Sequence, residues 1–380
     1  MEKKSLSHRH LLPDSAWAVL IVAFLPVSAF AATCESLARL RLETTTITSA
    51  QIVEAGTFTL PSDSPRSDPS FFTAFETLRA FCRVQGIIRP ATDSHIGFEV
   101  WLPESAWNGK YVGAGNGGLG GSINYYRLGE VVNAGYAGSS TDTGHTVSDH
   151  LWLEDKVKVV DFDYRAVYET ASKTKAIIAA FYGTTTARSY FNSCSTGGRQ
   201  GLIEAHKFPA DYDGILAGAP ALTIGDAKVV EDLKAFMARG GKLILYHGSE
   251  DDPIGTVNYY RRVIGRMGQT QTSDFVRLYV VPGMGHCGGG SGPDPTELGQ
   301  RITPRADAQH SVWMALEEWV ENGSRPGAII ATNYATEDDP SSGVVRTRPV
   351  CPYPMEARWT GNGSVEEAAG YVCDGVPVSK

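Results

Sequence analysis

The sequence lacks several patterns that would direct it to other classes of protein. Its six cysteines and nine histidines form no Cys-x-x-Cys pair and no cluster with zinc-ligand spacing, so we expect no metal. Basic residues are not clustered and the net charge of the 380 residues is −8, which argues against nucleic acid as a partner. Beyond residue 31 no apolar run approaches the length of a membrane span, so we expect no membrane partner either.

The first 31 residues are typical of a secretory signal peptide. Lys3, Lys4 and Arg9 precede an apolar run at 16–25, and the small-x-small triplet at 29–31 predicts cleavage after residue 31. A membrane anchor is the competing interpretation, but the run is short for a span. We therefore expect a secreted or periplasmic protein with a net charge of about −9, since the leader holds three basic and two acidic residues.

An even number of cysteines in an exported chain predicts disulfides. Six cysteines allow 15 pairings. Nearness in sequence favours Cys34–Cys82 and Cys351–Cys373, which leaves Cys194–Cys287.

Apolar strands alternate with helical patterns over residues 32–380, which predicts a single α/β domain with a mostly parallel sheet covered by helices on both faces. The expected strands are 57–60, 81–88, 96–102, a strand from Lys110, 134–140, a strand before Ser195, 214–220, 242–248 and 276–281. The expected helices are 161–182, 199–207, one capped by Asp226 that stops at Gly240, 258–267 and 307–322, and the tail from Pro340 is expected to be irregular.

Ser195 stands on a predicted turn between a strand and a helix, with Gly197 and Gly198 behind it. Small neighbours suit this strained turn, which lifts a serine hydroxyl to a helix N-terminus where a developing oxyanion is favoured. The usual pattern is Gly-x-Ser-x-Gly, and Ser193 here replaces its first glycine. The competing interpretation is a glycine-rich surface turn.

A glycine-rich loop, residues 113–121, follows the strand from Lys110. Backbone N–H groups of Gly117 or Gly118, with that of Thr196, are the candidates for an oxyanion hole. A flexible linker and a phosphate cradle are the alternatives, because glycine-rich loops alone are weak signals.

His286 and Asp251 each follow a later strand, and with Ser195 they give the chain order serine, aspartate, histidine of α/β-hydrolases. His286 is the candidate base and Asp251 the carboxylate that orients it, although Asp252 could take that part. Asp142 and His145 precede the serine, so we interpret them as organising a loop.

Several of these motifs resemble the tannase/feruloyl esterase family, which also includes mono(2-hydroxyethyl) terephthalate hydrolases. They are Asn192-Ser-Cys-Ser-Thr-Gly-Gly-Arg-Gln-Gly201, Ala217-Gly-Ala-Pro220, Leu245-Tyr-His-Gly248, Gly283-Met-Gly-His-Cys287, Thr141-Asp-Thr-Gly-His145 and Arg348-Pro-Val-Cys-Pro-Tyr353. The resemblance implies an α/β-hydrolase fold, with Ser195 as nucleophile, His286 as base and Asp251 as acid. It also implies a disulfide between Cys194 and Cys287, the neighbours of the serine and the histidine.

Family members usually carry a lid that holds a calcium site and most of the substrate pocket. The expected place, near residues 221–242, encodes only one helix, so we expect no lid and no cofactor. The resemblance implies a serine esterase for a small aromatic or hydroxycinnamic ester, such as a plant cell-wall ester. Alternatives are a hydrolase of terephthalate monoesters and a catalytically silent remnant that binds aromatic or polysaccharide surfaces.

Overall fold

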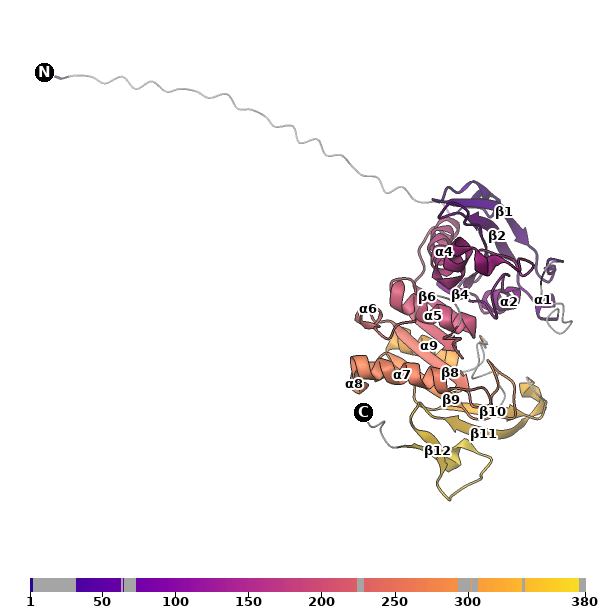
Figure 1. Cartoon of the computed structure of the whole chain (residues 1–380), viewed down its shortest axis with the longest axis vertical. Coiled ribbons are helices and arrows are strands. Elements are labelled where there is room, and N and C mark those ends of the chain that lie inside the picture. Colours follow the sequence, from indigo (N-terminus) through magenta and orange to yellow (C-terminus); the bar gives the residue numbers. More distant parts are fainter. Residues whose placement is uncertain are drawn as a thin grey trace. The chain divides into compact units, whose positions relative to one another are not determined.

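A nine-stranded sheet carries the fold, in the spatial order β1-β2-β3-β5-β4-β6-β7-β8-β9, and Figure 1 shows it from indigo β1 to orange β9. Neighbours from β5 to β9 pair in parallel, whereas β1 and β3 each pair antiparallel with β2, and β3 is antiparallel to β5. The strands are β1 (Thr45–Val53), β2 (Phe81–Ile88), β3 (Ile96–Pro103), β4 (Lys110–Ala114), β5 (Ala137–Thr141), β6 (Arg188–Cys194), β7 (Gly214–Gly218), β8 (Lys242–Gly248) and β9 (Val276–Val281).

The computed structural model describes residues 1–2, 32–62, 64, 73–223, 229–292, 302, 307–336 and 339–375. The predicted signal peptide, apart from its first two residues, and the predicted cap at Asp226 lie outside these ranges. Within them, no helix has both the length and the apolar character needed to cross a membrane.

Helices cover both faces of the sheet, because successive strand residues enter different apolar clusters. In β6, Tyr190 belongs to an apolar cluster that includes residues of α9 (Val312–Asn322), and its neighbour Phe191 belongs to another that includes residues of α4 (Ala166–Tyr182), α5 (Thr196–Lys207) and α7 (Ile254–Met267). In β8, Leu243 likewise belongs to the cluster of Phe191 and Ile244 to the cluster of Tyr190. This alternation is expected of a strand buried on both faces, and it produces the two-sided α/β architecture predicted from the sequence.

Each predicted helical segment contains a helix, with shifted ends, whereas the helices 73–76, 125–133 and 269–273 were not predicted. The predicted helix 161–182 is continuous with α3 through a π-helical turn at Asp161–Arg165, and the predicted helix 307–322 begins only at Val312, where Ser311 Oγ accepts a hydrogen bond from Met314 N–H. The helices are α1 (Thr73–Glu76), α2 (Tyr125–Asn133), α3 (Lys156–Val160), α4 (Ala166–Tyr182), α5 (Thr196–Lys207), α6 (Lys234–Ala238), α7 (Ile254–Met267), α8 (Gln269–Ser273) and α9 (Val312–Asn322).

Two predictions about the ends of the domain are wrong. Residues 57–60 form no strand; the edge of the sheet is β1, which the sequence pattern did not indicate. The C-terminal segment is not irregular but forms two small antiparallel sheets, β10 (Ile329–Tyr334) with β11 (Val344–Val350) and β12 (Glu356–Trp359) with β13 (Tyr371–Asp374).

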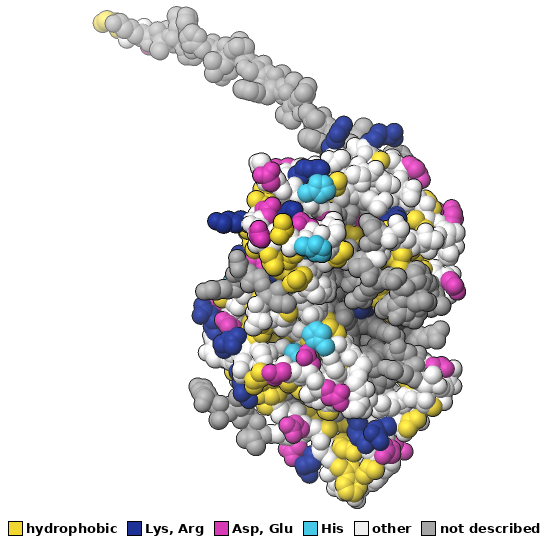
Figure 2. All heavy atoms as spheres, turned by 45° about the vertical axis from the view of Figure 1, so that its right-hand side comes forward, with side chains coloured by type: hydrophobic (Ala, Val, Ile, Leu, Met, Phe, Trp, Pro, Cys, Tyr) yellow, Lys and Arg dark blue, Asp and Glu magenta, His cyan; other side chains and the backbone are white. Residues whose placement is uncertain are grey.

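β12, β13 and the first half of β11 are largely exposed, which explains why their hydrophobic pattern is weak, whereas β10 is buried or half-buried. Every residue of β12 is exposed, and Trp359 retains 43% of its accessible surface. Yellow hydrophobic side chains gather at the lower end of the face in Figure 2, the end at which β12 lies in Figure 1. On the face shown, basic and acidic side chains are interspersed.

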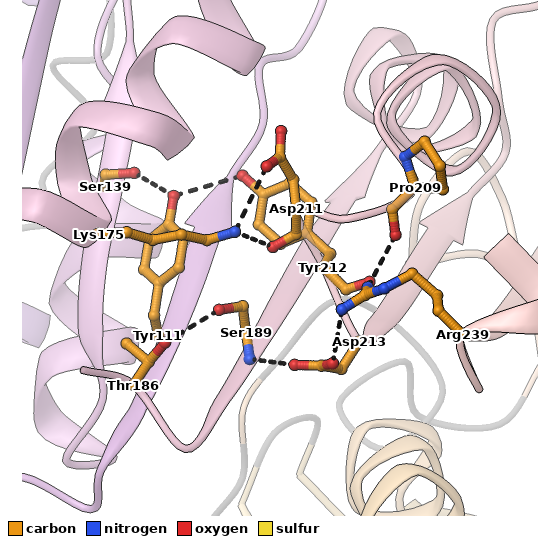
Figure 3. A network of polar contacts seen from close by, with 10 residues as sticks. All are labelled: Tyr111, Ser139, Lys175, Thr186, Ser189, Pro209, Asp211, Tyr212, Asp213 and Arg239. Atoms are coloured by element: carbon orange, nitrogen blue, oxygen red, sulfur yellow. Dashed lines mark hydrogen bonds and ion pairs between the residues drawn. The ribbon is translucent and has the colours of Figure 1, made fainter. Parts of the chain in front are cut away.

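A buried polar network joins the strands to the segment between α5 and β7 (Figure 3). Tyr111 Oη of β4 is 2.7 Å from Ser139 Oγ of β5 and 3.3 Å from Tyr212 Oη, and Lys175 Nζ of α4 lies 3.4 Å from Asp211 Oδ1. Burial raises the pKa of Tyr111 to about 12, so its hydroxyl stays protonated and hydrogen-bonded. The network fixes the amino ends of the central strands, opposite to the edge that carries the predicted site.

Candidate active site

Ser195 occupies a strained turn between β6 and α5. Its φ of 63° and ψ of −124° lie in a region that few residues other than glycine adopt. The turn is held by a 2.9 Å hydrogen bond from Ser195 N–H to the carbonyl of Gly218 in β7. A Cβ atom on Gly197 would lie 1.9 Å from Ser193 Oγ, so residue 197 must be glycine. This is the predicted serine turn, and it points to nucleophilic chemistry.

His286 and Asp251 are in direct contact. His286 Nδ1 lies 2.6 Å from Asp251 Oδ2, in a pair that joins the loop after β9 to the loop after β8. Burial acts to raise the pKa of Asp251, but hydrogen bonds and charges from His286 and His247 outweigh it and hold that pKa below its ordinary value. The carboxylate is therefore ionised at neutral pH, as an orienter of an imidazolium must be.

The three consecutive acids after β8 have three different partners. Glu250 binds the side chain of Ser291 in the histidine loop. Asp252 Oδ1 accepts a 3.0 Å hydrogen bond from Ile254 N–H at the start of α7. Of the two aspartates that the sequence left as candidates, the structure brings Asp251, and not Asp252, against His286.

His247, the penultimate residue of β8, was missed as a site residue by the sequence analysis. Its Nε2 lies 3.0 Å from Asp251 Oδ2, the same oxygen that His286 contacts, and its Nδ1 lies 2.8 Å from Thr256 Oγ1 on α7. Burial lowers the pKa of His247. The sequence signals were its place in the motif Leu245-Tyr-His-Gly248 and its spacing of four residues from Asp251.

The cysteine pairs predicted by nearness are present, as Cys34–Cys82, Cys351–Cys373 and Cys194–Cys287. The last joins the residue before Ser195 to the residue after His286. A ring nitrogen of His286 lies within 4.8 Å of both sulfur atoms. Since these sulfurs are bonded to each other, they offer no thiolate to a metal, and Cys194 is not a free nucleophile.

The glycine-rich loop is fastened to the helix that begins after Ser195. The hydroxyl of Thr196 donates to the carbonyl of Gly118. Asn116 and Gln200, both buried, exchange hydrogen bonds: Asn116 N–H donates to Gln200 Oε1 and Gln200 Nε2 donates to Asn116 Oδ1, each at 3.1 Å. The predicted oxyanion residues Thr196, Gly117 and Gly118 thus lie around one junction, although the sequence analysis did not identify the Asn116–Gln200 pair.

Asp142 and His145 organise this loop, as predicted. Asp142 Oδ1 accepts hydrogen bonds from Gly97 N–H at 2.9 Å and Gly144 N–H at 2.8 Å. His145 Nε2 lies 2.9 Å from the carbonyl oxygen of Leu119 and its ring stacks on Trp152. Burial is the largest influence on both side chains; it raises the pKa of Asp142 to about 7 and lowers that of His145.

Ser195 and His286 line one cavity of about 450 Å³, together with Gly117 and Gly118. Ser195 Oγ makes no hydrogen bond to any residue that the structure describes. Contacts between a nucleophile and its base are often loose before substrate binds. The cavity is large enough for a small organic ester.

Comparison with known proteins identifies a family. The model described as "Tannase and feruloyl esterase" matches residues 82–231 and 226–374. An uncharacterized esterase of Xanthomonas campestris pv. campestris is 29% identical over 547 aligned positions, covering 93% of each chain. A probable feruloyl esterase B-2 of Aspergillus terreus is 23% identical and covers 91% of this chain and 95% of its own.

Solved structures agree in fold. Feruloyl esterase B from Aspergillus oryzae superposes with a TM-score of 0.78 at 22% identity, over 90% of this chain and 99% of that one. Tannin acyl hydrolase from Aspergillus niger gives 0.66 at 16% identity, over 88% and 92% of the two chains. These similarities establish the predicted α/β-hydrolase fold. Because the family model spans most of the sequence, the chain belongs to the tannase and feruloyl esterase family and is a carboxylic ester hydrolase.

Proposed function

We propose that this chain is an exported serine esterase in which Ser195, His286 and Asp251 form the catalytic triad. The observation that carries the proposal is the 2.6 Å contact between His286 Nδ1 and Asp251 Oδ2, at the rim of a cavity that Ser195 also lines. This contact fixes the tautomer of His286, because Nδ1 must hold the proton that it donates to the carboxylate. Nε2 is then unprotonated and able to accept the proton of Ser195.

In the acylation step, Ser195 Oγ attacks the ester carbonyl carbon while its proton passes to His286 Nε2. The carbonyl π electrons move to the oxygen, which becomes an oxyanion. The backbone N–H of Thr196, at the N-terminus of α5, and that of Gly117 or Gly118 would stabilise this charge. When the intermediate collapses, the C=O double bond re-forms and the bond to the alkoxy oxygen breaks. That oxygen takes the proton from His286 Nε2, the alcohol departs, and the acyl group remains on Ser195.

Deacylation repeats these steps with water. His286 Nε2 takes a proton from water, the resulting hydroxide attacks the acyl carbon, and Ser195 Oγ leaves with the proton returned by His286. The products are a carboxylic acid and the restored hydroxyl. No metal is required at any of these steps.

We infer that the substrate is an ester of an aromatic or hydroxycinnamic acid and that the chain lacks a lid. Support for the substrate class comes from the names of the relatives. Support for the missing lid comes from two findings. The two family matches meet at residues 226–231, and the 547 positions aligned with the Xanthomonas relative hold at most 380 residues of this chain, which leaves at least 167 without a counterpart.

The proposal is tested with Ser195→Ala and with a matched pair of aspartate variants. Turnover of methyl ferulate, methyl gallate and a terephthalate monoester should be abolished by Ser195→Ala. Asp251→Asn should lower kcat by a factor of about 10⁴, whereas Asp252→Asn, which alters only a contact at the start of α7, should leave kcat unchanged.

The ester panel is run with and without calcium, since we expect activity that is independent of the ion. Full activity of Ser195→Ala would refute the assigned nucleophile. Failure of a fluorophosphonate probe to label Ser195 in the wild-type protein would favour a silent remnant that only binds aromatic or polysaccharide surfaces.

A further inference from the structure

The carboxylate of Asp251 accepts few hydrogen bonds that could fix its orientation. Its side chain is 33% exposed and lies on a loop. Among the residues that the structure describes, only His286 and His247 donate hydrogen bonds to it, both to Oδ2. In that part of the chain, no backbone N–H group contacts either oxygen. A carboxylate held only by the base that it must orient would be free to rotate with that base.

His247 is anchored far more firmly than its partners. Its side chain is 7% exposed, compared with 52% for His286. It sits on the buried strand β8, between β7 and β9, and its Nδ1 faces Thr256 Oγ1 of α7 at 2.8 Å. Strand and helix together hold the imidazole in place, so its Nε2 is a fixed point on the scaffold.

Asp251 determines which nitrogen of His247 carries the proton, and Thr256 is placed to pair with the other nitrogen. A carboxylate can only accept, so Nε2 must hold the proton that bridges the 3.0 Å to Asp251. In the neutral ring, which burial favours by lowering the pKa of His247, Nδ1 is then an acceptor and Thr256 Oγ1–H is its donor. Thr256 is itself buried. The hydrogen bonds therefore run from Thr256 to His247 to Asp251.

We propose that His247 is a positioning residue for the reaction: it fixes the rotamer of Asp251, which in turn orients His286, and Thr256 holds the imidazole of His247 by donating to its Nδ1. This inference rests on the proposed triad. His247 lies one carboxylate away from the base and does not touch the reacting atoms. Its contribution appears in kcat rather than in substrate binding.

Two substitutions of His247 separate its two contacts. His247→Asn places an oxygen near the former Nδ1, where it still accepts from Thr256, but it is too short to reach Asp251. His247→Gln places an amide N–H near the former Nε2 and restores the bond to Asp251. We expect His247→Asn to lower kcat about 10- to 100-fold, the size of effect that a displacement of about 1 Å produces, with KM within about twofold. His247→Gln should recover most of that loss.

Thr256 provides an independent test. Thr256→Val keeps the volume but removes the hydroxyl that donates to Nδ1, so the imidazole of His247 is no longer held by α7. Its kcat should fall as in His247→Asn, whereas Thr256→Ser should retain wild-type kcat. A purely structural role would instead lower the unfolding midpoint of all four variants without separating the two pairs.

Proton NMR gives a readout that does not depend on the ester. The wild-type protein should show two low-field, slowly exchanging imidazole N–H resonances, one from His247 and one from His286. His247→Asn should remove one and shift the other. If no ester is turned over by the wild-type protein but both resonances are present, the proposed function fails and the positioning bond stands. Unchanged kcat in His247→Asn, or an unprotonated His247 Nε2, would overturn the inference.

Discussion

Removal of the Cys194–Cys287 disulfide should affect both stability and catalysis. The bridge joins residues 93 positions apart, so loss of its constraint on the unfolded chain costs about 4–5 kcal/mol of unfolding free energy by chain entropy alone. It also holds the residue after His286, in a loop where that imidazole is 52% exposed. We expect the double variant Cys194→Ala/Cys287→Ala to lose this stability and, in addition, to lose about 10- to 100-fold in kcat through misplacement of the base.

The Cys351–Cys373 disulfide supplies the matched control. Its ends are 22 positions apart, which predicts a loss of about 3 kcal/mol, and the bridge joins the residue after β11 to β13, outside the residues that line the cavity of Ser195 and His286. Cys351→Ala/Cys373→Ala should therefore be destabilised but should turn over ester at the wild-type kcat. Stability is measured by urea unfolding, and kcat is measured well below each midpoint. Equal kcat in the two double variants would show that the first bridge contributes only stability and would refute the reasoning.

Two further predictions concern the surroundings of Ser195. Gly197→Ala should lose activity and at least about 1–3 kcal/mol of stability, because the new methyl carbon would lie 1.9 Å from Ser193 Oγ. The control variant Gly265→Ala, whose methyl group in α7 meets nothing within 4 Å, should instead gain about 0.5–1 kcal/mol. Urea unfolding measures both changes in stability. Asp142 has a pKa of about 7 in the folded state and 3.8 as its ordinary value, so the folded protein binds the extra proton and stability falls as the pH rises from about 4 toward 7. Both backbone donors reach Oδ1 of Asp142, so Asp142→Asn should keep these bonds and flatten this part of the pH–stability curve; a wild-type slope in the variant would contradict this account.

The parallel half of the fold could be predicted because its strands are buried on both faces. A continuous apolar run such as that of β8 predicts a buried strand, and the glycines after Ser195 predict the tight turn. The missed strands had no such signal. Residues of β1 are half-buried or exposed throughout and those of β12 are all exposed, so no burial required a clear alternation in their sequence.

The polar contacts of the site depend on tertiary geometry that spacing alone does not contain. Asp251 and Asp252 are equivalent in sequence, and only the start of α7 distinguishes them, because its first turn takes Asp252 as a partner. The sequence pattern placed His247 only within a strand. Its contact with Thr256 could not be predicted, because Thr256 becomes its neighbour only when α7 folds back along β8. Asn116 and Gln200 are separated by 84 positions, and nothing local connects them.

The direct adjacency of β7 and β8 has an engineering consequence. These strands pair without a break from Gly214 opposite Lys242 to Gly218 opposite Tyr246. In the alignment with the Xanthomonas relative, at least 167 positions have no residue of this chain. Our proposal that a lid is missing at the crossover between these strands implies that the register of the sheet does not depend on the length of polypeptide between β7 and β8. We therefore expect that the crossover between β7 and β8 is a site where a substrate-binding segment of a related hydrolase can be inserted without changing the strands that carry the proposed triad.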